Sequence, residues 1–365
     1  MIKKKILVAM SGGVDSSVAA ALLKEAGHEV AGATIRTWMA PDCPGRQANA
    51  CCGFTGMRDA REVAETLGIP FWIFNFEKEF KKLVMDHFAE EYLKGRTPNP
   101  CVDCNEHIKF RLFWERAKEL GFDDIATGHY ARVGYDETTG CYFIREGTDG
   151  GKDQSYVLFP LGQDLLAHLH LPVGDFEKNQ IREWAKEKKL RIWDKPDSQE
   201  ICFVPDDDYG AFLTKEYFKN DIGPGVIRLK DGSELGRHDG FFHYTRGQRR
   251  GLRVAYRERL YVIGTDPKKN EVILGTKKDM LNRGFFVSRL HWFLKPDFSR
   301  GPVKAQVKIR SQHAKSPAVL EDTGENRLRV VFDEAQDSIT PGQAAVFYRE
   351  DRSLGGGWID TVEDL

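Results

Sequence analysis

Three cysteines have the types and spacing that sulfur chemistry requires. Cys101 and Cys104 lie in residues 97–105, TPNPCVDCN, and Cys202 lies about a hundred residues later in residues 195–203, KPDSQEICF. The chain has seven cysteines, an odd number, and no secretion signal, which argues against a disulfide scaffold. Clustered cysteines in a reducing compartment more often bind a metal or act as nucleophiles.

The cysteine pattern admits three interpretations. Cys101 and Cys104 could bind structural zinc with Cys51 and Cys52, although adjacent cysteines make an awkward pair of tetrahedral ligands. Cys104 and Cys202 could instead form a redox or sulfur-transfer pair. In the third interpretation, an iron–sulfur cluster is held by Cys101, Cys104 and Cys202, with one iron site open.

Cys104 is the better candidate for a nucleophile. Two prolines, Pro98 and Pro100, predict an extended loop, and a helix is predicted over residues 107–120. Cys104 is the cysteine nearest to the N-terminus of this helix. The helix dipole would therefore stabilise the Cys104 thiolate.

A serine and glycine cluster near the N-terminus is typical of a phosphate-binding site. Residues 10–17, MSGGVDSS, follow a short apolar run and precede a helical pattern that stops at Gly27. Glycines let the backbone approach an anion, and a helix start offers N–H groups and the positive end of a dipole. The lysine of the ordinary P-loop is missing. Asp15 among the serines suits a Mg²⁺ ion held by pyrophosphate oxygens.

Alternating strand and helix patterns must position these groups. Strands are predicted at residues 6–10, 30–35, 71–76 and 124–127, with helices such as 57–67 between them. This alternation predicts a Rossmann-like α/β domain with a parallel sheet. Ligands bind such sheets at the carboxyl ends of the strands. Backbone groups near Ile35 and Gly128 are therefore candidates for contacting adenine and ribose, whereas His129 could be an ordinary polar residue at a strand end.

The remaining chain predicts two smaller β-rich units. A break at residues 220–225, NDIGPG, ends the first domain. We expect a catalytic domain over residues 1–216, a small mainly-β central domain over 217–280 and a C-terminal β-barrel over 281–365. The strand predicted at residues 303–310 places Lys304, Lys308 and Arg310 on a basic outer face.

Charge is unevenly distributed although the net charge is −1. Residues 221–310 contain 20 Lys and Arg against 9 Asp and Glu, and residues 244–251, YTRGQRRG, interleave aromatic and basic residues with glycine. This pattern favours RNA rather than DNA as a partner, bound by the central domain. No apolar run approaches the roughly 18 residues of a membrane helix, and no signal peptide is evident. We therefore expect a cytoplasmic protein that does not bind a membrane.

Several segments, in order, resemble one family, the tRNA-specific 2-thiouridylases. Residues 11–17 are similar to the SGGxDSS signature of PP-loop ATP pyrophosphatases. The loop 97–105 with the following His107-Ile108-Lys109-Phe110, and residues 198–203, SQEICF, resemble the 2-thiouridylases specifically. Residues 151–154, 247–252 and 308–310 also look like that family. The resemblance runs from Ile6 to near the C-terminus.

The resemblance implies ATP-dependent 2-thiolation of the wobble uridine of certain tRNAs. ATP, with Mg²⁺, would adenylate the C2 oxygen of the uridine and release pyrophosphate. A sulfur-relay donor protein or a cysteine desulfurase would load Cys202 as a persulfide, and its sulfur would displace AMP. Cys104 would act on the persulfide, and a Cys104–Cys202 disulfide would be the end state.

The resemblance also implies binding residues. Those for ATP are Ala9, Met10, Ser11, Gly12, Gly13, Val14, Asp15, Ser16, Ile35 and Gly128. Those for the target base are Asn99, Pro100 and Cys101, and those for other parts of tRNA are Lys152, Asp153, Gln154, Arg310 and Ser311. One departure matters, because many relatives carry Asp, a candidate acid/base group, at the position of Cys101. Cys101 cannot fill that role unchanged, and it completes the ligand set of the iron–sulfur alternative.

Two other functional classes use only part of these features. An amidating PP-loop ligase would consume ATP but leave Cys104, Cys202 and the basic segment without a role. A non-catalytic RNA-binding protein with a relic nucleotide fold would bind tRNA with a steep salt dependence and release no pyrophosphate.

Overall fold

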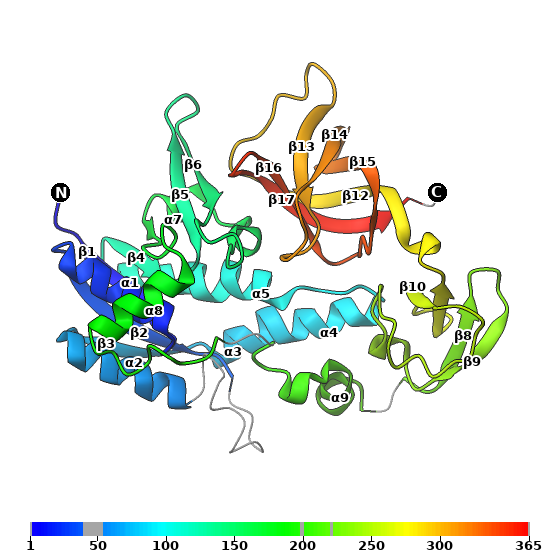
Figure 1. Ribbon diagram of the computed structural model, residues 1–365, viewed down its shortest axis with the longest axis horizontal. Helices are drawn as coiled ribbons and strands as arrows, with labels where there is room; N and C mark the ends of the chain where they lie inside the picture. Colours follow the sequence, from blue (N-terminus) through cyan, green and yellow to red (C-terminus); the bar gives the residue numbers. More distant parts are fainter. Residues whose placement is uncertain (1, 39–53, 198–200, 220–221, 364–365) are drawn as a thin grey trace.

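The computed structural model describes residues 2–38, 54–197, 201–219 and 222–363 (Figure 1). Cys43, Cys51 and Cys52 lie outside the described residues, and so does the zinc site that would need two of them. Residues 198–200 of the SQEICF motif also lie outside them. Within the described ranges, no helix is long and apolar enough to span a membrane.

A five-stranded parallel sheet forms the core of the N-terminal region. Its strand order is β3-β2-β1-β4-β7. The bounds are β1 (Lys5–Ala9), β2 (Glu29–Arg36), β3 (Phe71–Asn75), β4 (Asp124–Thr127) and β7 (Leu169–His170). Four of these strands were predicted, and the prediction of a Rossmann-like parallel sheet is confirmed. The strand order reverses at β1, which has β2 on one side and β4 on the other. Parallel sheets bind ligands at such a topological switch point.

Alternation along β1 explains why both faces of the sheet are covered. Ile6 and Val8 pack in a cluster with α1 (Val14–Glu25), α2 (Phe54–Leu67) and α8 (Lys178–Glu187). Leu7 points to the opposite face, into a larger cluster. All three side chains are fully buried, as expected for a central parallel strand.

The helix that carries Cys101 and Cys104 begins earlier than predicted. It runs without interruption through α5 (Pro100–Asp103), the π-helical stretch η3 (Cys104–Leu112) and α6 (Phe113–Glu119). The expectation of an extended loop up to residue 106 is therefore wrong. Pro100 occupies the first helical position, where proline is tolerated, and the side chain of Asn99 caps the helix by accepting from the Cys101 N–H at 3.1 Å.

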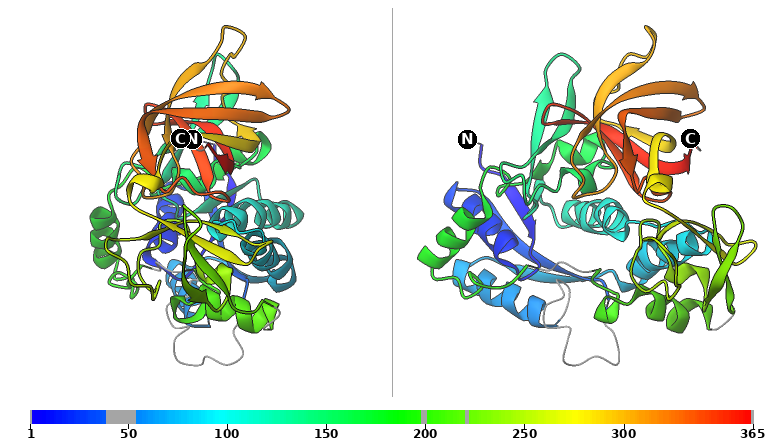
Figure 2. Two further views of the ribbon diagram at one scale, coloured as in Figure 1. Left: turned by 90° about the vertical axis from the view of Figure 1, so that its right-hand side faces the viewer. Right: turned by 45° about the vertical axis from the view of Figure 1, so that its right-hand side comes forward.

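A second long helical segment connects the parallel sheet to the central region. It comprises α3 (Glu77–Phe80), η2 (Lys81–Met85) and α4 (Asp86–Leu93). Figures 1 and 2 show this segment extending from the sheet, with the barrel lying above α4 and α5. The end of α4 touches the central region, where Thr265 donates to the Gly95 carbonyl at 3.3 Å.

The central region is small and mainly β, as predicted. Its sheet has the order β10-β11-β8-β9. The bounds are β8 (Gly225–Leu229), β9 (Glu234–His238), β10 (Tyr261–Asp266) and β11 (Glu271–Gly275), preceded by α9 (Tyr209–Leu213) and η6 (Thr214–Phe218). Between β9 and β10 lies the basic segment, which contains only the short helical turn η7 (Phe241–His243).

Six antiparallel strands at the C-terminus close into a barrel, which confirms the predicted architecture. The order is β12-β15-β14-β13-β16-β17, and β12 also pairs with β17. The bounds are β12 (Leu281–Trp292), β13 (Val303–Lys308), β14 (Ser316–Gly324), β15 (Arg327–Asp337), β16 (Ala344–Arg349) and β17 (Arg352–Val362). The hairpin β5 (Ala131–Asp136) and β6 (Cys141–Glu146) joins the barrel at one register pair, Arg352 with Arg145.

One side chain of the barrel contradicts its prediction. Lys308 was expected on an exposed basic face, but it is buried, and its ammonium lies 3.3 Å from Asp153 Oδ2. The remaining elements are short. They are η4 (Ser155–Leu158), α7 (Gln163–Leu166), η5 (Pro205–Asp207) and η8 (Lys278–Met280).

Candidate active site

The serine–glycine loop turns tightly between β1 and α1. Ser16 Oγ accepts from the Ser11 N–H at 3.1 Å, and Ser17 Oγ donates to the Gly13 carbonyl at 2.9 Å. Gly13 is the N-cap of α1 and supplies no side-chain cap. The first N–H groups of this 12-residue helix therefore face the loop without an intrahelical acceptor. This is the arrangement that binds phosphate oxygens.

Two glycines are required by close backbone approach. Gly12 has φ +74°, and a Cβ there would lie 2.1 Å from the Gly56 carbonyl oxygen. A Cβ on Gly128 would lie 2.5 Å from the Ser16 nitrogen. The predicted ATP residues of the loop and Gly128 are therefore brought together. Ile35 lies near the carboxyl end of the adjacent strand β2, at the same edge of the sheet.

Asp15 is held by two side chains that sequence reasoning did not assign. The Tyr130 hydroxyl donates to Asp15 Oδ1 at 2.6 Å, and the Lys178 ammonium lies 2.8 Å from each Asp15 oxygen. Burial, together with the charge of Asp15, raises the pKa of Tyr130 well above its ordinary value, so it remains a donor. An ammonium already stands against the Asp15 carboxylate. In this structure the Asp15 carboxylate is therefore paired with a cation of the protein itself.

Lys195 and Asp197 anchor the chain ahead of Cys202. The Lys195 ammonium donates to the Gly12 carbonyl at 3.0 Å and to Asp59 at 2.6 Å. Asp197 pairs with Lys178 at 2.8 Å. Residues 195–197 are thus fastened to the serine–glycine loop and to Lys178.

The residue after Cys202 is anchored as well. The Phe203 ring packs against those of Phe80 and Phe88, with centroids 5.7 and 5.3 Å apart, while Cys202 itself is exposed. Next to Phe88 on α4, His87 Nδ1 lies 2.9 Å from Asp103 Oδ2, and Asp103 precedes Cys104. The segments that carry Cys104 and Cys202 therefore pack against the same helix.

The electrostatic argument for Cys104 needs correction. Because the helix begins at Pro100, Cys101 lies in its first turn and is exposed, whereas Cys104 lies deeper in the helix and is buried. The dipole at the helix start therefore acts mainly on Cys101. Cys104 opens a π-helical stretch, a distortion often found at functional sites.

The iron–sulfur alternative is not supported by the arrangement of ligands. Among the described residues, no group of three or more His, Cys, Asp or Glu side chains is placed to hold a metal. Cys101, Cys104 and Cys202 are all described, and they do not form such a group.

Titratable groups surround the start of the cysteine helix. The hydrogen bond with Asp103 raises the pKa of His87, although burial opposes it. Burial, reinforced by Asp103, raises the pKa of Glu106 to about 7. Near neutral pH, small changes around this helix can thus change its charge.

The segment just before the residues expected to meet the target base is held by the C-terminal region. The Thr97 N–H donates to the Pro341 carbonyl at 2.9 Å, and Gln343 Nε2 donates to the carbonyls of Thr97 and Pro98 at 2.9 and 3.2 Å. Asn99 and Pro100 follow directly. Sequence reasoning missed Gln343, because nothing in a strand-flanking glutamine indicates a partner 246 residues away.

The loop with Lys152, Asp153 and Gln154 is extensively bonded within the protein. Lys152 pairs with Asp197 at 2.8 Å, and Gln154 Oε1 accepts from the Tyr130 N–H at 2.8 Å. The Asp153 side chain is 4% exposed and accepts from Ser155. The buried Asp153 side chain therefore stabilises the loop from inside and is not presented on its surface.

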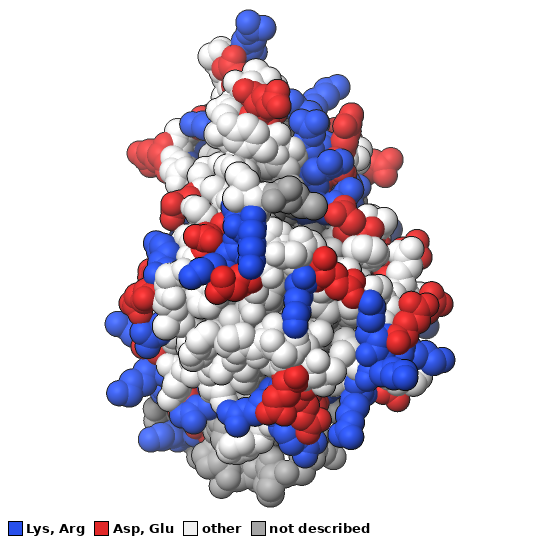
Figure 3. Space-filling model, turned by 90° about the vertical axis from the view of Figure 1, so that its left-hand side faces the viewer, with Lys and Arg blue, Asp and Glu red and all other residues white. Residues whose placement is uncertain are grey.

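Arg310 and Ser311 lie at a different place, just after β13. Arg310 is exposed and pairs with Asp337 at 3.5 Å. The contact between Lys308 and Asp153 links residues 151–154 to this strand. Figure 3 shows that basic and acidic side chains are mixed on the face of the molecule nearest the N-terminus.

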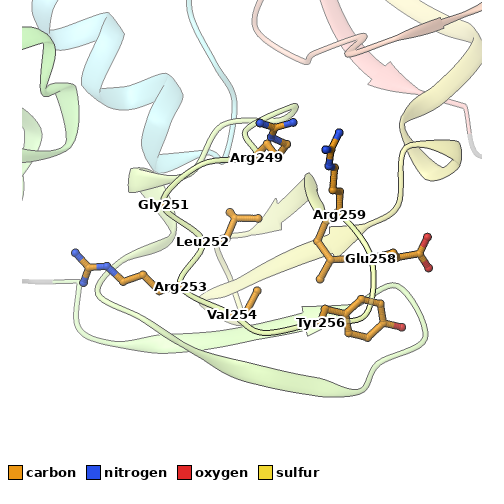
Figure 4. A pocket seen from close by; sticks show the side chains of 9 residues that line it. Arg249, Gly251, Leu252, Arg253, Val254, Tyr256, Glu258 and Arg259 are labelled. Atoms are coloured by element: carbon orange, nitrogen blue, oxygen red, sulfur yellow. The ribbon is translucent and has the colours of Figure 1, made fainter.

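The basic segment of the central region forms a cavity of about 420 Å³. Figure 4 shows the side chains of Arg249 and Arg259 on one side of it, with Leu252 and Val254 between the loops and Tyr256 at the edge. Both arginines are exposed. Arg246 of the same segment instead donates to Asn282 at 2.8 Å, so its role is structural.

Comparisons with known proteins give a consistent result over the whole chain. The family description "tRNA methyl transferase HUP domain" matches residues 4–206, the related PRC-barrel domain matches 211–276, and "Aminomethyltransferase beta-barrel domain" matches 282–359. The tRNA-specific 2-thiouridylase MnmA of Carboxydothermus hydrogenoformans is 48% identical, covering 98% of both chains. The enzyme of the same name from Geobacter metallireducens is 47% identical, covering 99% of this chain and 98% of its own, and that of Clostridioides difficile is 43% identical, covering 98% and 99%. This chain belongs to the family of tRNA-specific 2-thiouridylases.

Proposed function

We propose that this protein catalyses ATP-dependent 2-thiolation of the wobble uridine of tRNA. One observation carries the proposal. The chain ahead of Cys202 is fastened to the serine–glycine loop by Lys195, whose ammonium reaches the Gly12 carbonyl at 3.0 Å. This contact supports placing a loop suited to binding phosphate and a cysteine suited to carrying sulfur in one site. Its relatives' names state the same reaction on tRNA.

The first half of the reaction activates the uridine. ATP is bound by Ala9, Met10, Ser11, Gly12, Gly13, Val14, Asp15, Ser16, Ile35 and Gly128. The N–H groups at the start of α1 stabilise the phosphates, and the C2 oxygen of the uridine attacks the α-phosphate and expels pyrophosphate. Mg²⁺ would arrive on the phosphates of ATP, since the Asp15 carboxylate is already neutralised by Lys178.

The second half replaces the activated oxygen by sulfur. Cys202 is exposed, so a sulfur-relay donor protein or a cysteine desulfurase can reach it to form a persulfide. The terminal sulfur attacks C2 and AMP leaves. The Cys104 thiolate then attacks Cys202 Sγ, which forms the Cys104–Cys202 disulfide and releases the 2-thiouridine. A reductant restores both thiols in the cytoplasm.

Recognition of tRNA is divided among three regions. The target base, flipped out of its stack, meets Asn99, Pro100 and Cys101, which directly follow the segment held by Gln343 at Thr97 and Pro98. Lys152, Asp153 and Gln154 form a loop beside this site, with Asp153 shaping the loop from within, and Arg310 and Ser311 extend the surface to the barrel. The exposed arginines of the central region add contacts to phosphate. The parallel sheet, the four-stranded central sheet and the six-stranded barrel support the proposed domains 1–216, 217–280 and 281–365, with hairpin β5–β6 of the first domain pairing with the barrel.

The test is thiolation by the purified protein. ATP, Mg²⁺, a persulfide donor and unmodified tRNA are supplied, and pyrophosphate and 2-thiouridine are both measured. Wild type should form both. Cys202→Ser should release pyrophosphate without forming 2-thiouridine, and Cys104→Ser should stall after sulfur transfer. Cys141→Ser, in the hairpin outside the site, is the matched control and should behave as wild type.

Three results would contradict the proposal. Wild type that forms no 2-thiouridine, with or without oxygen, would exclude the reaction. Full activity in both Cys104→Ser and Cys202→Ser would exclude the relay. Pyrophosphate release driven by ammonia or an amino acid without tRNA would indicate an amidating ligase, and tRNA binding without pyrophosphate release a non-catalytic RNA-binding protein.

A further inference from the structure

Lys178 joins three segments of the site. Its ammonium lies 2.8 Å from both oxygens of Asp15 and 2.8 Å from Asp197 Oδ1. Its backbone N–H donates to Asp149 Oδ2 at 3.0 Å. The Lys178 side chain is only 9% exposed, so water cannot readily replace these partners.

The partners of Lys178 come from segments that act at different stages of the reaction. Asp15 belongs to the serine–glycine loop after β1. Asp197 lies five residues before Cys202, and Asp149 lies three residues before Lys152. The Lys152 ammonium also pairs with Asp197, at 2.8 Å from Oδ2. The contacts thus run from Lys152 through Asp197 and Lys178 to Asp15, with alternating charge.

The chemistry of lysine suits this position. An ammonium has three donors, and the structure offers it three carboxylate oxygens, two from Asp15 and one from Asp197. A planar guanidinium directs its donors differently, so arginine would not reproduce all three contacts. Two carboxylates facing each other without this cation would repel.

We propose that Lys178 is a positioning residue that keeps the loop activating the uridine in register with the segment delivering the sulfur. The inference rests on the proposed function and deepens it. Through Asp15, Lys178 fixes the loop that binds ATP, and through Asp197 it fixes the segment 195–197, which precedes the SQEICF motif of Cys202. Without this ammonium, activation of the uridine by ATP and delivery of sulfur by Cys202 are no longer aligned on the same uridine.

The experiment measures how many 2-thiouridines form for each pyrophosphate released. Lys178→Met should lower this ratio about tenfold or more, because small misplacements of reacting groups have large effects on rate. It should also raise the KM for ATP. Asp197→Asn keeps the size of the side chain and the pair between Lys178 and Asp15. It should lower the ratio while leaving the KM for ATP unchanged.

A matched control lies at the C-cap of the same helix. Lys188 pairs with Glu25, so it also connects the α8 segment to α1, but its side chain is 47% exposed. Lys188→Met should leave both the ratio and the KM for ATP at their wild-type values. Lys178→Arg, which keeps the charge, should recover only part of the ratio.

The outcomes separate this inference from the proposed function. If wild type thiolates tRNA and both Lys178→Met and Asp197→Asn keep the wild-type ratio, Lys178 does not position the two segments. A fall of both products in equal proportion would show a structural role only and would also overturn the inference. If Lys178→Met does not fold, Asp197→Asn decides the question. Absence of thiolation in wild type would overturn the proposed function itself.

Discussion

The site and the central region use basic side chains in opposite ways. In the site, Lys178 and Lys195 are 9% and 19% exposed; Lys178 lies between the carboxylates of Asp15 and Asp197, and Lys195 pairs with Asp59. In the central region, Arg249 and Arg259 are exposed at a cavity (Figure 4). The net charge of a segment therefore does not reveal what its cations do. Buried cations fix the geometry of the protein, and exposed ones remain available to an anionic partner.

The sharpest way to break this comparison is Lys195→Met. It removes one half of a largely buried pair with Asp59 and frees the Gly12 carbonyl, so we expect a loss of about 2–4 kcal/mol in the free energy of unfolding. Thermal or urea denaturation measures this loss, which should be nearly the same at low and high salt. A loss that disappears at high salt would place Lys195 with the exposed cations.

Arg249→Ala with Arg259→Ala tests the other side of the comparison. We expect tRNA affinity to fall by about tenfold, and the slope of log affinity against log salt to decrease by about 1–2. Filter binding over a salt series measures both, and the midpoint of unfolding should stay at its wild-type value. Arg237→Ala, an exposed arginine on β9 outside the cavity, is the control. Unchanged tRNA affinity in the double variant would remove the cavity from the RNA-binding surface.

Acid titration tests whether the carboxylate of Asp197 is paired with the lysines of the site. Burial alone would raise the pKa of Asp197, but hydrogen bonds from Lys152 and Lys178 bring it to about 2. A depressed pKa contributes stability above the ordinary value of 3.8, and this contribution is lost as pH falls toward 2. The stability difference between wild type and Asp197→Asn should therefore shrink over that window. A difference that stays constant down to pH 2 would contradict the pairing.

The smallest expected effect concerns His87, whose side chain is 27% exposed and therefore lies between the buried cations of the site and the exposed arginines of the central region. The hydrogen bond with Asp103 raises its pKa above the ordinary 6.5. A raised pKa contributes stability that is complete below 6.5 and is lost as pH rises through the higher, folded value. His87→Gln should therefore differ from wild type less at high pH than at pH 6. NMR titration of the His87 ring measures its pKa directly, and a value below 6.5 would contradict this prediction.

Local patterns in the sequence were sufficient for the framework of the molecule. The buried run Ile6–Ala9 and the glycines after it predict β1 and the tight turn, because both depend on neighbouring residues. The alternation after residue 281 likewise predicts the barrel strands. The start of the cysteine helix was predicted wrongly, because Pro100 was read as part of an extended loop rather than as its first residue.

Side chains with distant partners could not be predicted. Lys178 lies in a strongly charged helix whose sequence suggests only a solvated face, yet it meets Asp15 from 163 residues away. Lys308 belongs to an alternating strand, but its outward side faces Asp153 rather than water. Tyr130 lies in a segment that was expected to reach the site, and only its bond to Asp15 was unforeseen. Sequence periodicity predicts on which face of a helix or strand a residue lies. Only the folded structure shows which other residues cover that face.

The contact between Thr97 and Pro341 sets an order on the maturation of the enzyme. The chain is synthesised at about 5–20 residues per second, so the N-terminal domain emerges and folds first. The loop that leads to Asn99 and Cys101 still lacks its support then, because Pro341 and Gln343 lie between the last strands of the barrel. The barrel in turn closes only when β17 pairs with β12. A nascent chain can thus acquire its nucleotide fold well before its base-recognition loop is complete, so activity should begin only with the final strand.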